Sequence, residues 1–358
     1  MGLFTIMVLY WVFPFVSPGM LDLSTRNTAV YFLGFVVCSF LLFYVYRDMA
    51  WCKQVCPLGR VLAAHGKVGV LAISTEQKSC STCSTFECAK ACAYHLSPFR
   101  FDARNNMEAC TLCTDCVTAC DSVHLVVRPP GAALRKPILG SDRQEAWLFI
   151  LILAVVGVGV QFQHFISHTP LAAYMPWTIL GGKLQAWSGS DPMQLNFEGS
   201  LILVFALAMT VSLSVWAYGR ASRLADRSWN EAAGVLAVAL APLALIGLLP
   251  HALTTFSTRD AHALVAAAGT LAGTSWQIEP LAVPGDPVLQ VISMLGFVGI
   301  LWSLRLVWQR SAVLADNGVA RVRIWAYGSL PVLFYALILV SGIVSMVLFK
   351  AGAASHGH

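Results

Sequence analysis

Eight of the 11 cysteines in this chain lie between Cys80 and Cys120, and no other feature limits the possible fold as strongly. They form two groups of four, and in each group a three-residue spacer precedes the last cysteine. The groups are Cys80, Cys83, Cys88 and Cys92, followed by Cys110, Cys113, Cys116 and Cys120. The second has the spacing C-x2-C-x2-C-x3-C, in which three thiolates on one loop hold one cubane cluster and the fourth ligates a neighbouring cluster. The pattern therefore predicts two [4Fe-4S] clusters.

In this interpretation the last cysteine of each group crosses to the other cluster. The first cluster would be held by Cys80, Cys83, Cys88 and Cys120, and the second by Cys110, Cys113, Cys116 and Cys92. The first group departs from the bacterial ferredoxin pattern because four residues, Ser84 to Glu87, stand where two are usual, so we expect a bulged loop. The proline that usually follows the fourth cysteine is replaced by Ala93 and Asp121.

Two other uses of these cysteines are open. Cys80 and Cys83 with Cys110 and Cys113 could form one tetrahedral zinc site, which would leave four cysteines without a role. A disulfide framework is disfavoured, because the charge bias described next places the cysteines in the reducing cytoplasm.

Composition places the chain in a lipid bilayer. Of its 358 residues 57% are hydrophobic and only 11% are charged, and the mean hydropathy of +0.69 is too high for a soluble core to hide the apolar residues. Apolar runs of helical length predict seven membrane spans. These runs are Leu3 to Val16, Thr28 to Tyr46, Ala146 to Ile166, Ser200 to Tyr218, Ala232 to Leu249, Val288 to Val307 and Trp325 to Phe349.

Basic residues predict the orientation of these spans. The cysteine-containing loop and every second loop after it carry 19 of the 23 lysines and arginines. The positive-inside rule therefore puts the N-terminus and the cysteines in the cytoplasm and the C-terminus outside. This topology accounts for the net charge of +5, and we expect no nucleic-acid partner because no nucleic-acid-binding motif occurs in the sequence.

The predicted fold is a mainly α membrane protein of about seven transmembrane helices, with an inserted small α+β two-cluster ferredoxin-like domain. Within the insert, short helices begin at Cys88 and Cys116, and Leu125 to Val127 suits a strand; Ala261 to Gly273 reads as a helix on the bilayer surface. The predicted units are a helical hairpin (1–50), a boundary segment (51–75), the two-cluster domain (76–130), a linker (131–145), a five-helix bundle (146–350) and a tail (351–358).

Two further sets of residues could bind metal. Cys52 and Cys56 form a C-x3-C-P motif at the membrane boundary, where they could hold a soft metal or act as a dithiol, although two inert buried residues would give the same pattern. His164 and His168, one helical turn apart, and His251 could hold a b-type haem or copper between two spans, although interfacial hydrogen bonding would also explain them.

Residues 47–127 resemble the NapH/NosR/CcoG group of membrane polyferredoxins. The resemblance lies in the tryptophan before the C-x3-C-P motif, Trp51, and in the two cysteine groups that follow, which end in Cys116-Val117-Thr118-Ala119-Cys120-Asp121. It implies that the eight cysteines ligate clusters on the cytoplasmic side of a bacterial inner membrane, and that Cys52 and Cys56 are the family's C-x3-C-P pair. The chain has only one such motif, and five apolar spans replace the periplasmic β-sandwich of the oxidase-assembly members.

These features predict membrane-bound electron transfer through two [4Fe-4S] clusters, between a cytoplasmic or quinone-pool donor and a membrane or periplasmic partner. Such a chain would work with other subunits of a membrane redox complex. An alternative is a copper reductase or assembly factor for a respiratory metalloenzyme, in which Cys52 and Cys56 are the working thiols. A third is a transporter or structural membrane subunit with a zinc-stapled loop.

Overall fold

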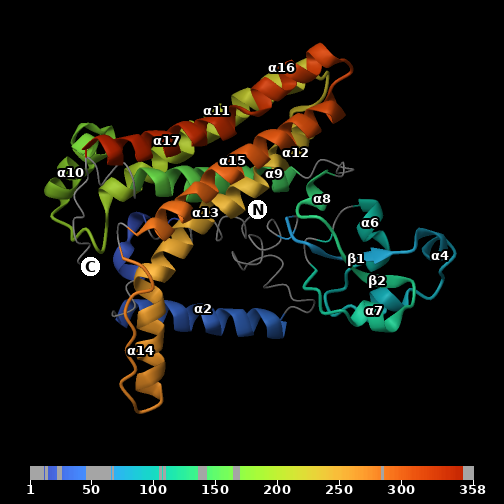
Figure 1. Ribbon diagram of the computed structural model, residues 1–358, viewed down its shortest axis with the longest axis horizontal. Coiled ribbons are helices and arrows are strands. Elements are labelled where there is room, and N and C mark those ends of the chain that lie inside the picture. Colours follow the sequence, from blue (N-terminus) through green and yellow to red (C-terminus); the bar gives the residue numbers. More distant parts are fainter. Residues whose placement is uncertain are drawn as a thin grey trace.

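The computed structural model describes residues 12, 15–21, 26–45, 66, 68–104, 107, 110–135, 143–163, 170–283 and 286–349. The described chain is mainly helical and contains one two-stranded sheet. Figure 1 shows long helices packed side by side in an elongated bundle, with the sheet and several short helices gathered beside it.

Three helices of the described chain are long and apolar enough to cross a membrane. They are α11 (Phe197–Leu224), α15 (Pro287–Leu314) and a continuous helical segment, Trp229–Thr270. A helix of 28 residues is about 42 Å long at 1.5 Å per residue, enough for the hydrocarbon core and both headgroup regions. α16 (Gly318–Gly328) and α17 (Leu330–Phe349) meet at a bend of 43° and give a fourth span if they cross together.

The continuous segment changes its helical type along its length. It comprises α12 (Trp229–Ala237), a short 3-10 turn η7 (Val238–Leu240), α13 (Ala241–Thr255), the π-helix η8 (Phe256–Asp260) and α14 (Ala261–Leu271). A helix is thus present at the predicted place as α14, but it continues α13 without a break, and its position on the bilayer surface stays a prediction. In Figure 1, α14 points away from the bundle.

Four predicted spans therefore match helices that could cross a membrane: Ser200 to Tyr218, Ala232 to Leu249, Val288 to Val307 and Trp325 to Phe349. Two others correspond to shorter apolar helical segments, Val36–Val45 within α2 (Arg26–Val45) and Ala146–Gly159 within α9 (Arg143–Ile152) and the π-helix η4 (Leu153–Gly159). The first, Leu3 to Val16, lies mostly outside the described residues. The structure supports three or four spans, and the count of seven stays a prediction.

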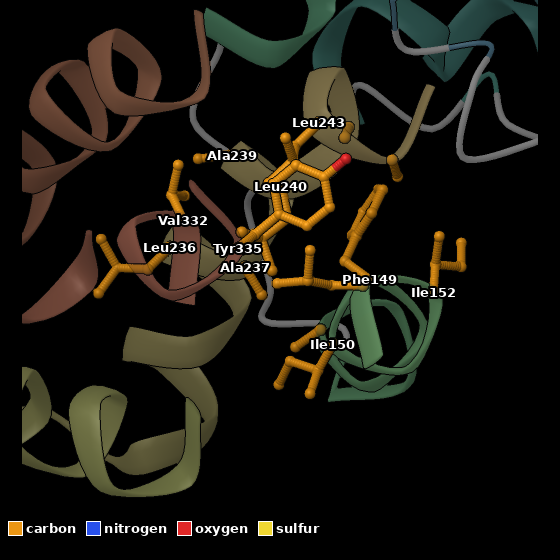
Figure 2. Packing of buried hydrophobic residues seen from close by; sticks show 14 of the residues in the cluster. Phe149, Ile150, Ile152, Leu236, Ala237, Ala239, Leu240, Leu243, Val332 and Tyr335 are labelled. Carbon is orange, nitrogen blue, oxygen red and sulfur yellow. The ribbon is translucent and has the colours of Figure 1, made fainter. Parts of the chain in front are cut away.

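The core of the bundle forms where α12, η7 and α13 pack against α9 and α15. Figure 2 shows Phe149 and Ile150 of α9, Leu240 of η7 and Tyr335 of α17 directed toward one another. Alanines dominate the middle of this cluster, and Ala237, Ala239 and Ala241 are fully buried. Small side chains let helix backbones approach closely where lipid provides no hydrophobic drive between helices. Outside the cysteine-containing region, the described chain also contains η1 (Pro18–Leu21), η6 (Pro170–Tyr174) and α10 (Pro176–Ser188).

Residues 68–135, here called the cysteine domain, are built on the two-stranded sheet. Strands β1 (Leu71–Thr75) and β2 (Val123–Val127) pair antiparallel, with Leu71 opposite Val127 and Thr75 opposite Val123. The short helices are α4 (Gln77–Ser81), α5 (Glu87–Lys90), η3 (Pro98–Arg100), α6 (Phe101–Arg104), α7 (Asp115–Ala119) and α8 (Ala132–Arg135). The predicted short helices and the strand are therefore present.

The cysteine domain is joined to the bundle through its last turn. Gly131 adopts a φ of +69°, and a Cβ added there would lie 2.6 Å from Cζ2 of Trp302 on α15. From the same helix, the buried Arg310 donates from Nε to the carbonyl of Leu134 and from Nη1 to the carbonyl of Val235 on α12, both at 3.0 Å. One side chain thus connects the domain, α12 and α15.

Candidate metal centre in the cysteine domain

The two cysteine groups fold in closely similar ways. In each, a residue in the left-handed conformation caps a short helix: Phe86 with φ +51° precedes α5, and Thr114 with φ +69° precedes α7. The first helical residue is acidic, Glu87 or Asp115, and the second is the third cysteine of its group. The fourth cysteine lies just beyond each helix. This repeat directs equivalent sulfurs inward from two helices that pack against each other.

A small hydrophobic core fills the space between these helices and the sheet. It contains Ile73, Phe101 and Val123 together with the buried cysteines Cys88 and Cys116. A cysteine in such a setting can be an inert small hydrophobe, so burial alone assigns no role. The electrostatic interactions among the sulfurs show which cysteines lie near one another.

Around the first set, Cys120 acts on two cysteines of the other group. Burial raises the pKa of the Cys80 thiol, and negative charge on Cys120 and Cys83 raises it further, against a hydrogen bond from Thr75. Burial also raises the pKa of the Cys88 thiol, with added contributions from Cys120 and Cys80. These mutual effects place Cys80, Cys83, Cys88 and Cys120 in one neighbourhood.

The second set is organised in the same manner. Burial raises the pKa of the Cys110 thiol, and negative charge on Cys113 and Cys92 raises it further. The pKa of Cys116 is raised to about 11, first by burial and then by charge on Cys110, Cys113 and Cys92. All four cysteines line one small pocket, whose other walls include Ile73, Leu96 and Phe101. The structure thus brings together the two crossed sets expected from the spacing, while cluster ligation by them stays a prediction.

The donor set of each group is four thiols, a set that both a cubane cluster and a single zinc ion can take. Among the described residues, no group of three or more histidines, cysteines and acids is close enough to hold one metal ion. Four thiolates on one zinc, each about 2.3 Å from the metal, must nearly touch, whereas in a cubane each thiolate ligates a different iron. The zinc hypothesis also needs Cys80 and Cys83 beside Cys110 and Cys113, but these pairs interact with different cysteines.

Cys83 differs from the four cysteines above in the direction of its pKa shift. Its pKa is lowered by hydrogen bonds from the backbone N–H of Phe86, from the Thr85 hydroxyl and from the Thr85 N–H. The Thr85 oxygen lies 3.8 Å from Cys83 Sγ. These donors come from the long spacer of the first group. The length of this spacer predicts a bulge, but it does not predict hydrogen bonds to sulfur.

An ionic network that the sequence does not reveal closes the sheet beside the cysteines. Asp102 accepts from the Ser74 hydroxyl at 2.8 Å, from the Thr75 N–H at 3.0 Å and from Arg128 at 2.6 Å. Burial acts to raise the pKa of Asp102, but these three donors outweigh it and the pKa is lowered. No local pattern signals this network, because its members come from β1, α6 and the end of β2.

The other predicted metal ligands remain unassigned. Cys52, Cys56, His164 and His168 lie outside the described residues. His251 lies in α13 and is exposed at the bundle surface. A dithiol at the membrane boundary and a haem or copper site between spans therefore stay predictions.

Comparison of the whole chain with models of protein families, with curated protein sequences and with solved structures gave no match.

Proposed function

We propose that this chain is a membrane-bound electron-transfer protein whose cysteine domain holds two [4Fe-4S] clusters, as in the NapH/NosR/CcoG group that it resembles. The observation that carries the proposal is the crossed arrangement of the cysteines. Cys120 interacts with Cys80 and Cys88, while Cys92 interacts with Cys110 and Cys116. A disulfide framework or a single zinc site does not call for two crossed sets of four thiols.

The residues of the domain would bind and shield the clusters. Each bound cluster supplies one-electron chemistry, because its irons share the transferred electron. The eight cysteines would provide the thiolates, and the burial and neighbouring charge that raise the pKa of Cys88 and Cys116 would be offset by bound metal. Ile73, Leu96 and Phe101 line the second site and limit the access of water.

A cytoplasmic position for the domain is supported by the end of the bundle to which it is joined. Arginines of α11, α15 and α16 occur there with aromatic residues: Arg220 lies over the ring of Tyr327, and Arg321 lies 4.2 Å from the ring centroid of Trp308. Basic residues favour the cytoplasmic side, and tryptophan and tyrosine concentrate at membrane interfaces. Since Arg310 ties the domain to this part of α15, we propose that the clusters face the cytoplasm of a bacterial cell.

The proposed electron path runs between a cytoplasmic or quinone-pool donor and a partner in or beyond the membrane. The three or four helices that could cross the bilayer would anchor the domain beside such partners. We expect these partners to be other subunits of a membrane redox complex.

Anaerobic purification from membranes tests the proposal. We expect iron and acid-labile sulfide in comparable amounts, with electron paramagnetic resonance (EPR) signals of two reduced [4Fe-4S] clusters. Zinc without iron would reject the proposal. The crossing is tested separately: Cys92→Ser and Cys113→Ser should alter the same EPR signal, and Cys83→Ser and Cys120→Ser the other. Cys38→Ser, in α2, is the matched control and should leave both signals unchanged.

A further inference from the structure

We infer that the lengthened spacer of the first cysteine group raises the reduction potential of the cluster held by Cys83, through a hydrogen bond donated by the Thr85 hydroxyl to that sulfur. This inference rests on the proposed function, because it requires clusters to be bound. It gives the four-residue spacer of the first group a role in setting the reduction potential. From the spacing alone, this spacer is only a departure from the ferredoxin pattern.

The shared geometry of the two groups locates the additional residues. In the second group, the left-handed residue Thr114 directly follows Cys113. In the first, the left-handed residue is Phe86, and Ser84 and Thr85 stand between it and Cys83. Beyond the left-handed residue both groups continue with one acid and then the third cysteine. Ser84 and Thr85 are therefore the two extra residues.

These extra residues bring donors to the sulfur of Cys83. The Thr85 hydroxyl lies 3.8 Å from Sγ, and the N–H groups of Phe86 and Thr85 also donate to it. A cysteine that ligates iron is a thiolate and has no proton to give. In the loaded protein the Thr85 hydroxyl must therefore be the donor.

The corresponding loop of the second group uses its threonine differently. The Thr114 hydroxyl donates to the carbonyl oxygen of Cys113 at 2.6 Å. One group thus directs a threonine hydroxyl at sulfur, and the other directs it at backbone oxygen. Thr114 provides a control of the same residue type in the corresponding loop of the second group.

Aromatic packing holds the donor loop in position. Phe86 packs against Phe99 with ring centroids 4.9 Å apart and ring planes tilted by 46°, and Arg100 lies over the Phe99 ring with its Cζ 5.2 Å from the centroid. A left-handed conformation is uncommon for residues other than glycine, and this packing helps Phe86 to keep it. The loop that carries Thr85 is thereby held beside Cys83.

Hydrogen bonds to a ligating sulfur favour the more negative oxidation state. One-electron reduction of a cluster adds one negative charge, which is spread partly onto the thiolate sulfurs, and donors at those sulfurs stabilise it. No proton moves and no bond breaks in this step. The donor at Cys83 therefore makes the first cluster easier to reduce than the same cluster would be without it.

Redox titration of the full-length protein, with dithionite as electron donor and EPR as the readout, tests the inference. Thr85→Val removes the hydroxyl and keeps the shape of the exposed side chain. We expect the midpoint potential of one cluster to fall while the other stays unchanged. Thr85→Ala should shift the same cluster in the same direction, and Thr85→Ser should restore the wild-type value. Thr114→Val should change neither potential.

The result separates this inference from the proposed function. Iron and sulfide absent from the wild-type protein would overturn both. Wild-type iron content, with both midpoints unchanged in Thr85→Val and Thr85→Ala, would overturn only the tuning role. Equal shifts of both clusters would also contradict it, because the hydroxyl contacts a sulfur of one set only.

Discussion

At the scale of single residues, the cysteine domain concentrates charge that it cannot easily neutralise by itself. Burial and neighbouring thiolates raise the pKa of Cys80, Cys88, Cys110 and Cys116. A thiolate at any of these positions costs free energy unless a cation compensates it. The interior of the domain therefore favours either protonated thiols or bound metal.

Asp102 allows a residue-scale prediction with a defined pH dependence. Its pKa is lowered in the folded protein, so its contribution to stability is complete above the unfolded-state pKa of about 3.9 and is lost as the pH falls through the folded-state pKa. Asp102→Asn should destabilise the domain at pH 7 by about 1–2 kcal/mol, after discounting for solvent screening of the partly exposed pair. Below about pH 4 the difference between variant and wild type should shrink.

Hydrogen–deuterium exchange of peptides from β1, followed by mass spectrometry, measures this effect across the pH range. Asp121→Asn, which changes an exposed carboxylate of the same domain, is the control and should exchange like the wild type. An equal acceleration in both variants would show that the network around Asp102 has no special role.

At the scale of helices and strands, apolar periodicity predicted where helices occur better than where they end. The predicted spans Ser200 to Tyr218 and Val288 to Val307 lie inside α11 and α15, which continue to Leu224 and Leu314. Backbone hydrogen bonding does not stop where hydropathy falls, so the helices extend into their arginine-bearing ends. The predicted span Trp325 to Phe349 is instead divided at Ser329, because Pro331 lacks an N–H and its ring disfavours a straight helix.

The contact between Gly131 and Trp302 gives a prediction at this scale. Gly131→Ala adds about 1–2 kcal/mol for the left-handed backbone and about 1–3 kcal/mol for overpacking against the indole. Gly273→Ala is a matched control, since its φ of +70° is nearly the same but no atom lies within 4 Å of the added Cβ. Thermal unfolding in detergent should show a larger loss for Gly131→Ala. Equal losses would mean that backbone strain alone acts at residue 131.

The hydrogen bonds of Arg310 make a second element-scale prediction. Arg310→Leu removes two charge-assisted hydrogen bonds, each worth about 1.5–3 kcal/mol, and leaves the carbonyls of Leu134 and Val235 without this donor. Hydrogen exchange should rise in α8 and around η7 together. Arg305→Leu, on an exposed position of the same helix, should leave both regions protected. A rise in α8 alone would show that the arginine does not couple the domain to α12.

At the scale of the whole molecule, the sequence indicated which cysteines lie near one another but not how their domain is attached to the bundle. The crossed cysteine sets follow from local spacing, because each group lies within one short loop and helix. The junction with the bundle depends on Arg310 reaching Leu134, 176 residues earlier in the chain, and on backbone carbonyls that every sequence contains. No local pattern encodes such a contact, which involves only residues 131–135 at the start of the predicted linker.

The topology of the whole chain provides the last prediction. The turn between α15 and α16 lies at the arginine-rich end of the bundle, and the loop after α14 lies at the other end of the helical segment that begins with α12. If the arginine-rich end is cytoplasmic, a cysteine introduced at the exposed Asp316 should react with a membrane-impermeant maleimide only after lysis. One introduced at the exposed Gln277 should react in intact spheroplasts. Labelling in the reverse order would place the cysteine domain outside the cell, where thiols tend to be oxidised to disulfides, and would argue against the proposed clusters.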